Sequence, residues 1–180
     1  MAHFEIKRSS REIYSGHILR LTSDTVELEN GKQAKREVVH HPGGAGVVPM
    51  TENGEVYLVR QFRYAFGQEL LEIPAGKLEQ GEDPMETACR ELKEECGLTA
   101  QRMQPLHPIY PSVGYDTEII YLYLATGLSQ TEACPDADEF LTPEKWPLEQ
   151  LVERIMAGEL RDAKTVAALL KVWYMICRKR

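Results

Sequence analysis

The segment from Gly76 to Leu98, GKLEQGEDPMETACRELKEECGL, constrains the fold most, because it predicts one well-delimited helix with a strongly acidic surface. Asp83 can cap the helix, Pro84 suits the first helical position, and Gly97 provides the C-terminal stop. The segment crowds five glutamates into a short span: Glu82, Glu86, Glu91, Glu94 and Glu95. Such like charges repel one another, so either solvent or a bound cation is expected beside them.

Helical periodicity separates the apolar and acidic side chains of this segment. At 3.6 residues per turn, it predicts one buried stripe made of Met85, Cys89, Leu92 and Cys96. Glu91, Glu94 and Glu95 follow i, i+3, i+4 spacing and share another face. Clustered carboxylates offer the hard oxygen ligands that Mg²⁺ or Mn²⁺ requires. A solvated acidic face is the alternative interpretation.

Composition excludes several classes of function. The chain has 180 residues, 43% hydrophobic and 27% charged, which predicts a folded globular protein. A net charge of -7 and the lack of a basic run disfavour a nucleic-acid partner. The N-terminus has no apolar signal region, and no stretch is long enough to span a membrane. The four cysteines lack metal-site spacing, so reduced thiols in a cytoplasmic protein are expected.

The order of expected elements indicates a mixed sheet flanked by helices, of the α/β or α+β class. An N-terminal β region, residues 1–43, ends at the HPGG turn, and a main domain follows over residues 44–180. Strands are expected at 4–7, 17–28, 37–40, 69–76 and 117–125, and around a hairpin turn at 51–55. Two helices are expected to close the chain, over 148–156 and from 163 to about 177, the second capped by Asp162.

The acidic segment resembles the Nudix box, G-x5-E-x7-R-E-U-x-E-E-x-G-U, where U is bulky and apolar. Every specified position is filled, from Gly76 through Glu82 and Arg90 to Gly97 and Leu98. The resemblance implies the Nudix fold, a mixed sheet sandwiched between helices with an N-terminal antiparallel β extension. It also implies a site for Mg²⁺, or Mn²⁺, whose ligands are Glu91, Glu94, Glu95 and the carbonyl of Ala75. In this family Arg90 pairs with Glu82, and both residues, like Gly76 and Gly97, have structural roles.

Four further stretches resemble the ADP-ribose pyrophosphatase branch: KREVVHHPGG, VYLVRQFRY, LLEIPAGKLE and RDAKTVAALL. The branch hydrolyses ADP-ribose to AMP and ribose 5-phosphate, and its relatives cleave other nucleoside diphosphate sugars. Val113 occupies a position where this branch usually has proline. That departure favours a broader range of sugar nucleotides, such as GDP-mannose.

The same resemblance suggests which residues contact the substrate. Arg36 and Arg63 align with arginines that bind phosphates, and a guanidinium suits phosphate oxygens; a solvated strand arginine is the alternative for each. Glu118 could accept a hydrogen bond from a sugar hydroxyl. The general base is expected to be Glu139, in the acidic loop CPDADEF, or the box residue Glu94, with Glu95 also essential for catalysis.

Two questions of function stay open at this level. In the ADP-ribose branch the N-terminal region packs across a homodimer and helps to bind the base, so a homodimer is expected; packing on its own domain is the alternative. A Nudix-like module that binds a nucleotide without cleaving it is the competing function, as is hydrolysis of another nucleoside diphosphate derivative. The complete set of box glutamates favours hydrolysis.

Overall fold

The computed structural model describes residues 3–134 and 140–178. The chain divides into two compact units. Unit 1 comprises the residues up to Gly43 together with Tyr110–Ile119, and unit 2 comprises Gly44–Ile109 and the chain from Ile120 onward. Segment 110–119 therefore belongs with the N-terminal residues although it is distant from them in sequence.

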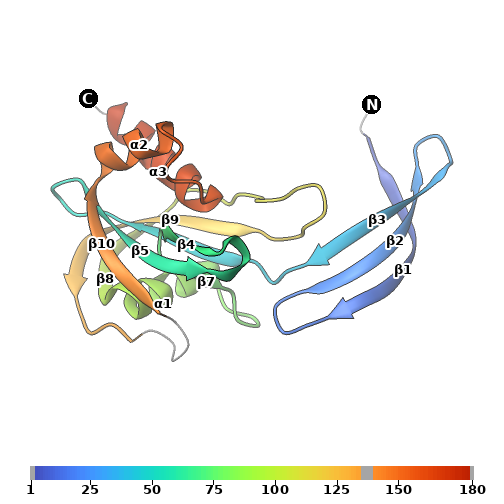
Figure 1. Cartoon of the computed structure of the whole chain (residues 1–180), viewed down its shortest axis with the longest axis horizontal. Coiled ribbons are helices and arrows are strands. Elements are labelled where there is room, and N and C mark those ends of the chain that lie inside the picture. The colour runs from blue at the N-terminus through green and yellow to red at the C-terminus, as the bar shows by residue number, and fades with distance from the viewer. Residues whose placement is uncertain (1–2, 135–139, 179–180) are drawn as a thin grey trace. The chain divides into compact units, whose positions relative to one another are not determined.

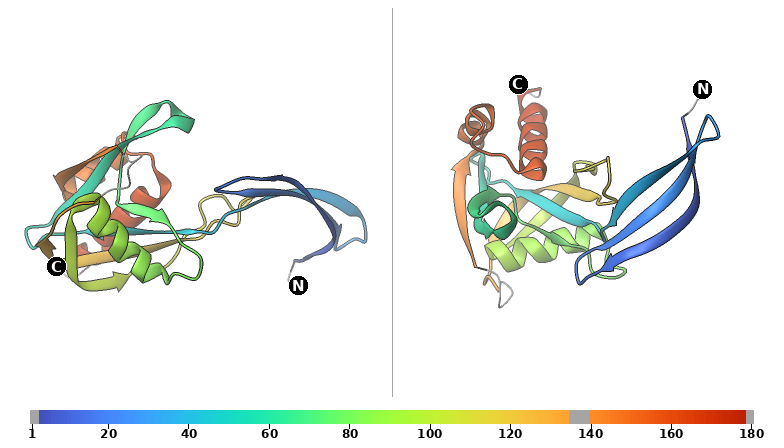
Figure 2. Two further views of the ribbon diagram at one scale, coloured as in Figure 1. Left: turned by 90° about the horizontal axis from the view of Figure 1, so that it is seen from below. Right: turned by 45° about the vertical axis from the view of Figure 1, so that its right-hand side comes forward.

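Unit 1 is a curved antiparallel sheet with the strand order β1-β2-β3 (Figure 2). Its strands are β1 (Glu5–Ser15), β2 (Arg20–Leu28) and β3 (Gln33–His40). β1 is exposed along its whole length, whereas Thr22, Asp24 and Val26 on β2 are buried. Segment 110–119 joins β3 through Val39, whose N–H donates to the carbonyl of Tyr115 at 2.7 Å.

Unit 2 contains two sheets and three α-helices. One sheet has the order β10-β5-β6, and the other has the order β7-β4-β9-β8, in which β4 and β9 are parallel. The strands are β4 (Gly44–Pro49), β5 (Glu55–Arg63), β6 (Gln68–Glu72), β7 (Ala75–Lys77), β8 (Leu98–Pro105), β9 (Ile120–Gln130) and β10 (Leu141–Pro147). The helices are α1 (Pro84–Cys96), α2 (Leu148–Met156) and α3 (Ala163–Cys177), and a short 3-10 turn, η1 (Tyr64–Phe66), links β5 to β6.

Helices cover both sides of the strands of unit 2, with α1 on one side and α2 and α3 on the other (Figure 1). Strand alternation explains the two cores, since neighbouring side chains of β4 point to opposite faces. Val47 packs in the core with Leu92 of α1, whereas Val48 packs in the core with Leu151 of α2 and Leu169 of α3. The expected mixed architecture is confirmed. Of the helices in the described part of the chain, none is both long and apolar enough to cross a membrane.

The boundaries of α1 are those that the sequence predicts. The Asp83 side chain accepts a hydrogen bond from the N–H of Met85 at 2.8 Å, and Gly97 adopts the left-handed conformation, with φ 61°. Gly97 also lies close to other backbone, because a Cβ there would be 2.9 Å from the carbonyl oxygen of Thr131. The sharp end of the helix allows β8 to begin at once, at Leu98.

The predicted apolar stripe of α1 is partly wrong. Leu92 and Cys96 are buried as expected, but Met85 and Cys89 are exposed. The buried face also carries Thr87, Ala88, Glu91 and Glu95. The helix is therefore rotated about its axis relative to the expectation, so that two carboxylates lie on the side that packs on the sheet.

Candidate active site

Arg90 is hydrogen-bonded to three carboxylates of the acidic segment. Its Nε and Nη2 atoms donate to the two oxygens of Glu82 at 3.0 and 3.2 Å. Its Nη1 atom donates to Glu91 at 2.7 Å and to Glu94 at 2.9 Å. The hydrogen bond from Arg90 lowers the pKa of Glu82 to about 2, and the hydrogen bond to Glu82 is the largest cause of the raised pKa of Arg90. Arg90 thus ties the loop before α1 to the helix.

Strand β7 approaches the acidic face of α1 very closely. A Cβ atom at Gly76 would lie 1.8 Å from Oε1 of Glu91, so only glycine leaves room for this carboxylate. One residue earlier, the N–H of Ala75 donates to Oε2 of Glu95 at 3.1 Å. Both glutamates are nearly inaccessible, with 6% exposure for Glu91 and 2% for Glu95. The close approach brings the Ala75–Gly76 backbone and two buried carboxylates together.

The donor set fits a hard divalent cation, because it consists of carboxylate oxygens with a neighbouring backbone segment. The carboxylate of Glu91 occupies the space that a Cβ at position 76 would need, which explains why this position is glycine. Within residues 3–134 and 140–178, no three acidic, histidine or cysteine side chains converge in a geometry that could hold a metal. Arg90 instead lies between Glu91 and Glu94 and bonds to both.

Arg63, a predicted phosphate ligand, forms a bidentate ion pair with Glu72. The two bonds measure 2.7 Å from Nε and 2.8 Å from Nη2. Glu72 is 1% exposed and also accepts a hydrogen bond from Lys164 of α3. Burial opposes the charged form of Glu72, but the hydrogen bonds from these two cations outweigh it and lower its pKa. The sequence interpretation missed Glu72 and Lys164, although an acidic residue inside the apolar run LLEIP is a signal.

Two other predicted substrate residues belong to unit 1. Arg36, on β3, donates from Nε to Glu5 of β1 at 3.0 Å, and a second bond joins Nη2 to the same carboxylate. Glu118 has a carboxylate oxygen 3.5 Å from Nδ1 of His41. Val113 is 82% exposed. Glu139, the first choice for the general base, lies outside the described residues.

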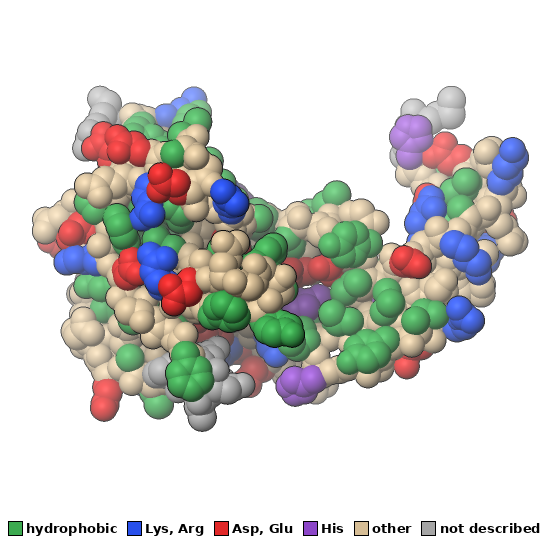
Figure 3. All heavy atoms as spheres, in the orientation of Figure 1, with side chains coloured by type: hydrophobic (Ala, Val, Ile, Leu, Met, Phe, Trp, Pro, Cys, Tyr) green, Lys and Arg blue, Asp and Glu red, His purple; other side chains and the backbone are tan. Residues whose placement is uncertain are grey.

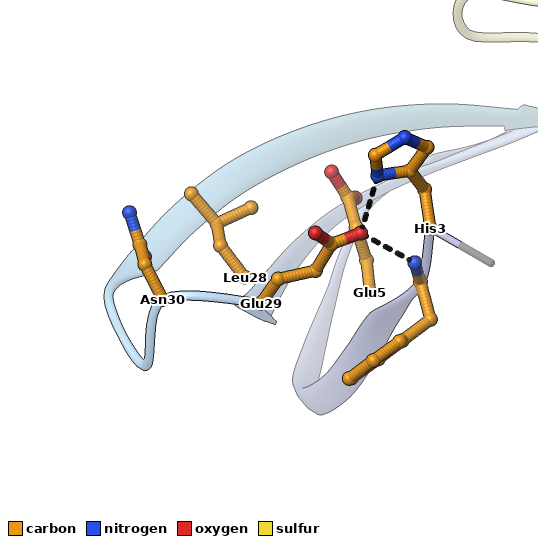
Figure 4. A pocket seen from close by; sticks show the side chains of 6 residues that line it. His3, Glu5, Leu28, Glu29 and Asn30 are labelled. Carbon is orange, nitrogen blue, oxygen red and sulfur yellow. Dashed lines mark hydrogen bonds and ion pairs between the residues drawn. The ribbon is translucent and has the colours of Figure 1, made fainter. Parts of the chain in front are cut away.

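Unit 1 also has a cavity of about 610 Å³, between the start of β1 and the turn after β2 (Figure 4). Its lining residues are His3, Phe4, Glu5, Leu28, Glu29 and Asn30. Oε1 of Glu29 accepts the N–H of Phe4 at 3.0 Å and lies 2.8 Å from Nδ1 of His3. None of these six residues is a predicted catalytic or metal-binding residue, so the candidate active site remains at the acidic helix of unit 2.

The family of the chain follows from comparison with known proteins. Residues 40–169 match the model of the NUDIX domain. The chain belongs to the Nudix family. Residues 5–39 match the nucleoside diphosphate sugar hydrolase N-terminal domain. Nudix hydrolases generally use divalent metal ions, in agreement with the oxygen-rich donor set on α1.

Two curated relatives are similar to this chain over most of their length. An ADP-ribose pyrophosphatase of Bacillus subtilis is 41% identical over 172 residues, which cover 94% of this chain and 93% of the relative. A protein of Bacillus methanolicus named methanol dehydrogenase activator is 42% identical over 162 residues, covering 89% of this chain and 88% of the relative. A solved structure of an ADP compounds hydrolase has a TM-score of 0.85 at 21% identity and covers 97% of this chain and 95% of its own. This last likeness confirms the Nudix fold.

Proposed function

We propose that this Nudix protein hydrolyses the diphosphate bond of ADP-ribose or of related nucleoside diphosphate sugars, in a reaction that depends on Mg²⁺ or Mn²⁺. The products are a nucleoside monophosphate and a sugar phosphate. The observation that carries the proposal is the packing of Gly76 against Glu91, which brings the β7 backbone to the acidic face of α1. The similarity to ADP-ribose pyrophosphatase over nearly the whole chain supports the substrate class.

The chain's own residues have distinct tasks in this reaction. Glu91, Glu94, Glu95 and the carbonyl of Ala75 would hold the divalent ion. When bound, such an ion neutralises the charge of the diphosphate and makes a coordinated water more acidic. The carboxylate of Glu94 or of Glu139 takes a proton from the attacking water. The water oxygen bonds to one phosphorus, and the bond from that phosphorus to the bridging oxygen breaks, so the bridging oxygen leaves with the other phosphate.

Arg63, Arg36 and Glu118 are proposed to bind the substrate. Each arginine is held through two of its nitrogens by one carboxylate, Arg63 by Glu72 and Arg36 by Glu5. A guanidinium has five N–H groups, so donors remain for a phosphate after such a bidentate pair has formed. Glu118 is proposed to accept a hydrogen bond from a sugar hydroxyl.

A homodimer is proposed as the working form, built through unit 1. Large hydrophobic side chains are exposed on β1 of its sheet and directly beside that strand: Phe4, Ile6, Ile13, Tyr14 and Ile18. Figure 3 shows hydrophobic side chains gathered on its face, with Lys and Arg along its right-hand edge. A second copy of the chain would cover this apolar surface. A cytoplasmic location is proposed because all four cysteines are free thiols.

A second role, activation of a methanol dehydrogenase, is suggested by the relative from Bacillus methanolicus. Its test is the rate of a purified methanol dehydrogenase with and without this protein. A hydrolytically dead variant in the same assay decides whether activation needs diphosphate cleavage.

The direct test of hydrolysis is phosphate release in a phosphatase-coupled assay with Mg²⁺, on ADP-ribose, GDP-mannose, UDP-glucose and ATP. We expect Glu95→Gln to lower turnover by about two orders of magnitude or more, because it removes one proposed ligand charge. The fold should persist, since the amide oxygen can still accept the Ala75 N–H bond. Glu86→Gln is the matched control, because it makes the same change at an exposed position of the same helix. Near wild-type turnover by Glu95→Gln would contradict the proposed ligand set.

A further inference from the structure

Glu72 is a buried carboxylate between two cations. Its side chain is 2% exposed, and its oxygens accept bonds from Nε and Nη2 of Arg63 and from Nζ of Lys164. Replacing a buried ion pair by apolar residues of similar volume is often neutral or stabilising in proteins. Stability alone therefore does not explain why a charged residue occupies position 72. The orientation that Glu72 gives to the side chain of Arg63 is a better explanation.

The same cluster is anchored at the N-terminus of α3. Oδ2 of Asp162 accepts the N–H of Thr165 at 3.0 Å, the hydroxyl of Thr165 at 2.6 Å and Nζ of Lys164 at 3.0 Å. Oγ1 of Thr165 in turn accepts the N–H of Ile73 at 2.9 Å. The residue directly after Glu72 is thus fixed to α3, and Lys164 is fixed beside Glu72. These bonds hold the Glu72 carboxylate in one place.

Arg63 keeps donors that this cluster does not use. Within the described part of the chain, its hydrogen bonds involve Nε and Nη2, and the Arg63 side chain is 40% exposed. Its Nη1 group can therefore serve an outside acceptor. Because a guanidinium is planar and rigid, fixing Nε and Nη2 also fixes the direction of Nη1.

This cluster lies close to the acidic helix. Glu72 precedes Ala75 by three residues, a separation of at most about 10 Å in an extended chain. The N–H of Ala75 is bonded to Glu95. The pKa of Arg63 is raised mainly by the hydrogen bond to Glu72, and the charges of Asp162 and Glu95 add to the effect. The negative charge of Glu95, a proposed metal ligand, therefore stabilises the charged form of Arg63.

We propose that Glu72 is a positioning residue, which Lys164 and the start of α3 hold so that it directs Arg63 toward the diphosphate of the substrate. Glu72 does not touch the substrate; it acts through Arg63. The inference rests on the proposed function, because it assumes that Arg63 binds a substrate phosphate. A role in folding alone predicts a different response, because it would lower stability without a specific effect on phosphate binding.

The test is a double-mutant cycle on Arg63→Ala and Glu72→Gln, read out in two ways. Calorimetry measures the binding of an ADP-ribose analogue whose bridging oxygen is replaced by methylene, and the coupled assay measures kcat and KM for ADP-ribose. Val172→Ala is the matched control, because it removes buried packing of α3 in the core but leaves the bonds around Glu72 and the Arg63–Glu72 pair. The thermal midpoint of each variant reports on its fold.

We expect Glu72→Gln to weaken binding of the analogue roughly tenfold to a hundredfold, the usual effect of a lost charge-assisted hydrogen bond. KM should rise more than kcat falls. In the Arg63→Ala background, Glu72→Gln should add little, because the residue through which it acts is gone. Val172→Ala should lower the thermal midpoint and leave binding within about twofold, a change worth less than a single hydrogen bond.

Additive effects of the two substitutions, or unchanged binding by Glu72→Gln, would overturn the positioning role. Binding without turnover by the wild-type protein would refute the proposed hydrolysis, while the cycle in analogue binding would still decide on Glu72. A wild-type protein that binds no analogue would refute both.

Discussion

At Gly76 the backbone of β7 comes so near to α1 that a single methyl group would displace Glu91. We predict that Gly76→Ala lowers turnover about a hundredfold, the loss expected when a catalytic group moves by about 1 Å. The measurement is kcat at saturating Mg²⁺. Gly158→Ala is the control, because Gly158 has φ 75° and open space around it. That control should cost about 1–2 kcal/mol of stability through backbone strain and leave turnover unchanged. Equal turnover by both variants would contradict the proposed role of Gly76.

Glu82 provides a prediction for acid stability. Its pKa is lowered from 4.5 to about 2 by the hydrogen bond from Arg90, so its charged form favours the folded state. The stability contributed by this pair is fully present above about pH 4.5 and is lost as the pH falls toward about 2. We expect Glu82→Gln to flatten the dependence of the free energy of unfolding on pH in that window.

The measurement for Glu82 is urea unfolding at a series of pH values. Glu79→Gln is the control, since it removes a charge from an exposed neighbour in the same loop. A Glu82→Gln profile parallel to that of the wild type would show that the pair with Arg90 does not stabilise the fold.

At the scale of elements, α1 depends on its first turn. We predict that Asp83→Ala lowers the free energy of unfolding by about 1 kcal/mol, because the N–H of Met85 loses its acceptor. Asp83→Asn should recover most of that loss, since its side-chain oxygen can still cap. Chemical denaturation measures both. If the alanine and asparagine variants are equally stable, the cap does not contribute.

The sequence predicted elements with clear ends and missed those without them. α1 and α3 were predicted because Asp83 and Asp162 are recognisable caps. β10 was missed because LTPEKWP contains two prolines; the structure places it at a sheet edge, where proline is tolerated. β8 was missed because its polar residues do not alternate and it begins directly after Gly97. The rotation of α1 was missed because periodicity counts apolar residues and ignores buried carboxylates.

At the candidate site, the sequence predicted some of the side-chain contacts and missed others. The resemblance to the Nudix box implied that Arg90 pairs with Glu82, and the structure contains this pair. The i,i+4 spacing places Glu94 within reach of Arg90, and the structure has this bond as well. The bond to Glu91 was not expected, because adjacent residues on a helix do not face each other. Glu72, the partner of Arg63, was missed although it is only nine residues away. Lys164, which also bonds to Glu72, was missed because these two residues are 92 apart in sequence. Contacts of that kind depend on how β6 and α3 pack.

At the scale of the whole molecule, the proposed dimer depends on the exposed apolar side chains of β1. Ile6 and Ile13 are 41% and 48% exposed. We predict that the double variant Ile6→Lys, Ile13→Lys is a monomer of about 20.5 kDa, whereas the wild type sediments at twice that mass, because lysine resists burial in an apolar interface. Sedimentation equilibrium measures both.

Arg11→Gln is the control for the dimer, because it changes an exposed polar residue of the same strand and should leave the mass unchanged. A monomeric wild type would contradict the proposed assembly. A double variant that remains dimeric would place the interface elsewhere.

The contacts of Arg90 have a consequence for the order of events after synthesis. In many small metalloproteins the ion is part of the folding reaction, and the empty chain is unfolded. Here an internal cation already compensates part of the charge of the acidic segment, through its bonds to Glu82, Glu91 and Glu94. The newly made chain is therefore expected to fold before a metal binds. Under the proposed function, hydrolysis would begin only when a divalent ion binds and would stop when it dissociates, without a cycle of unfolding.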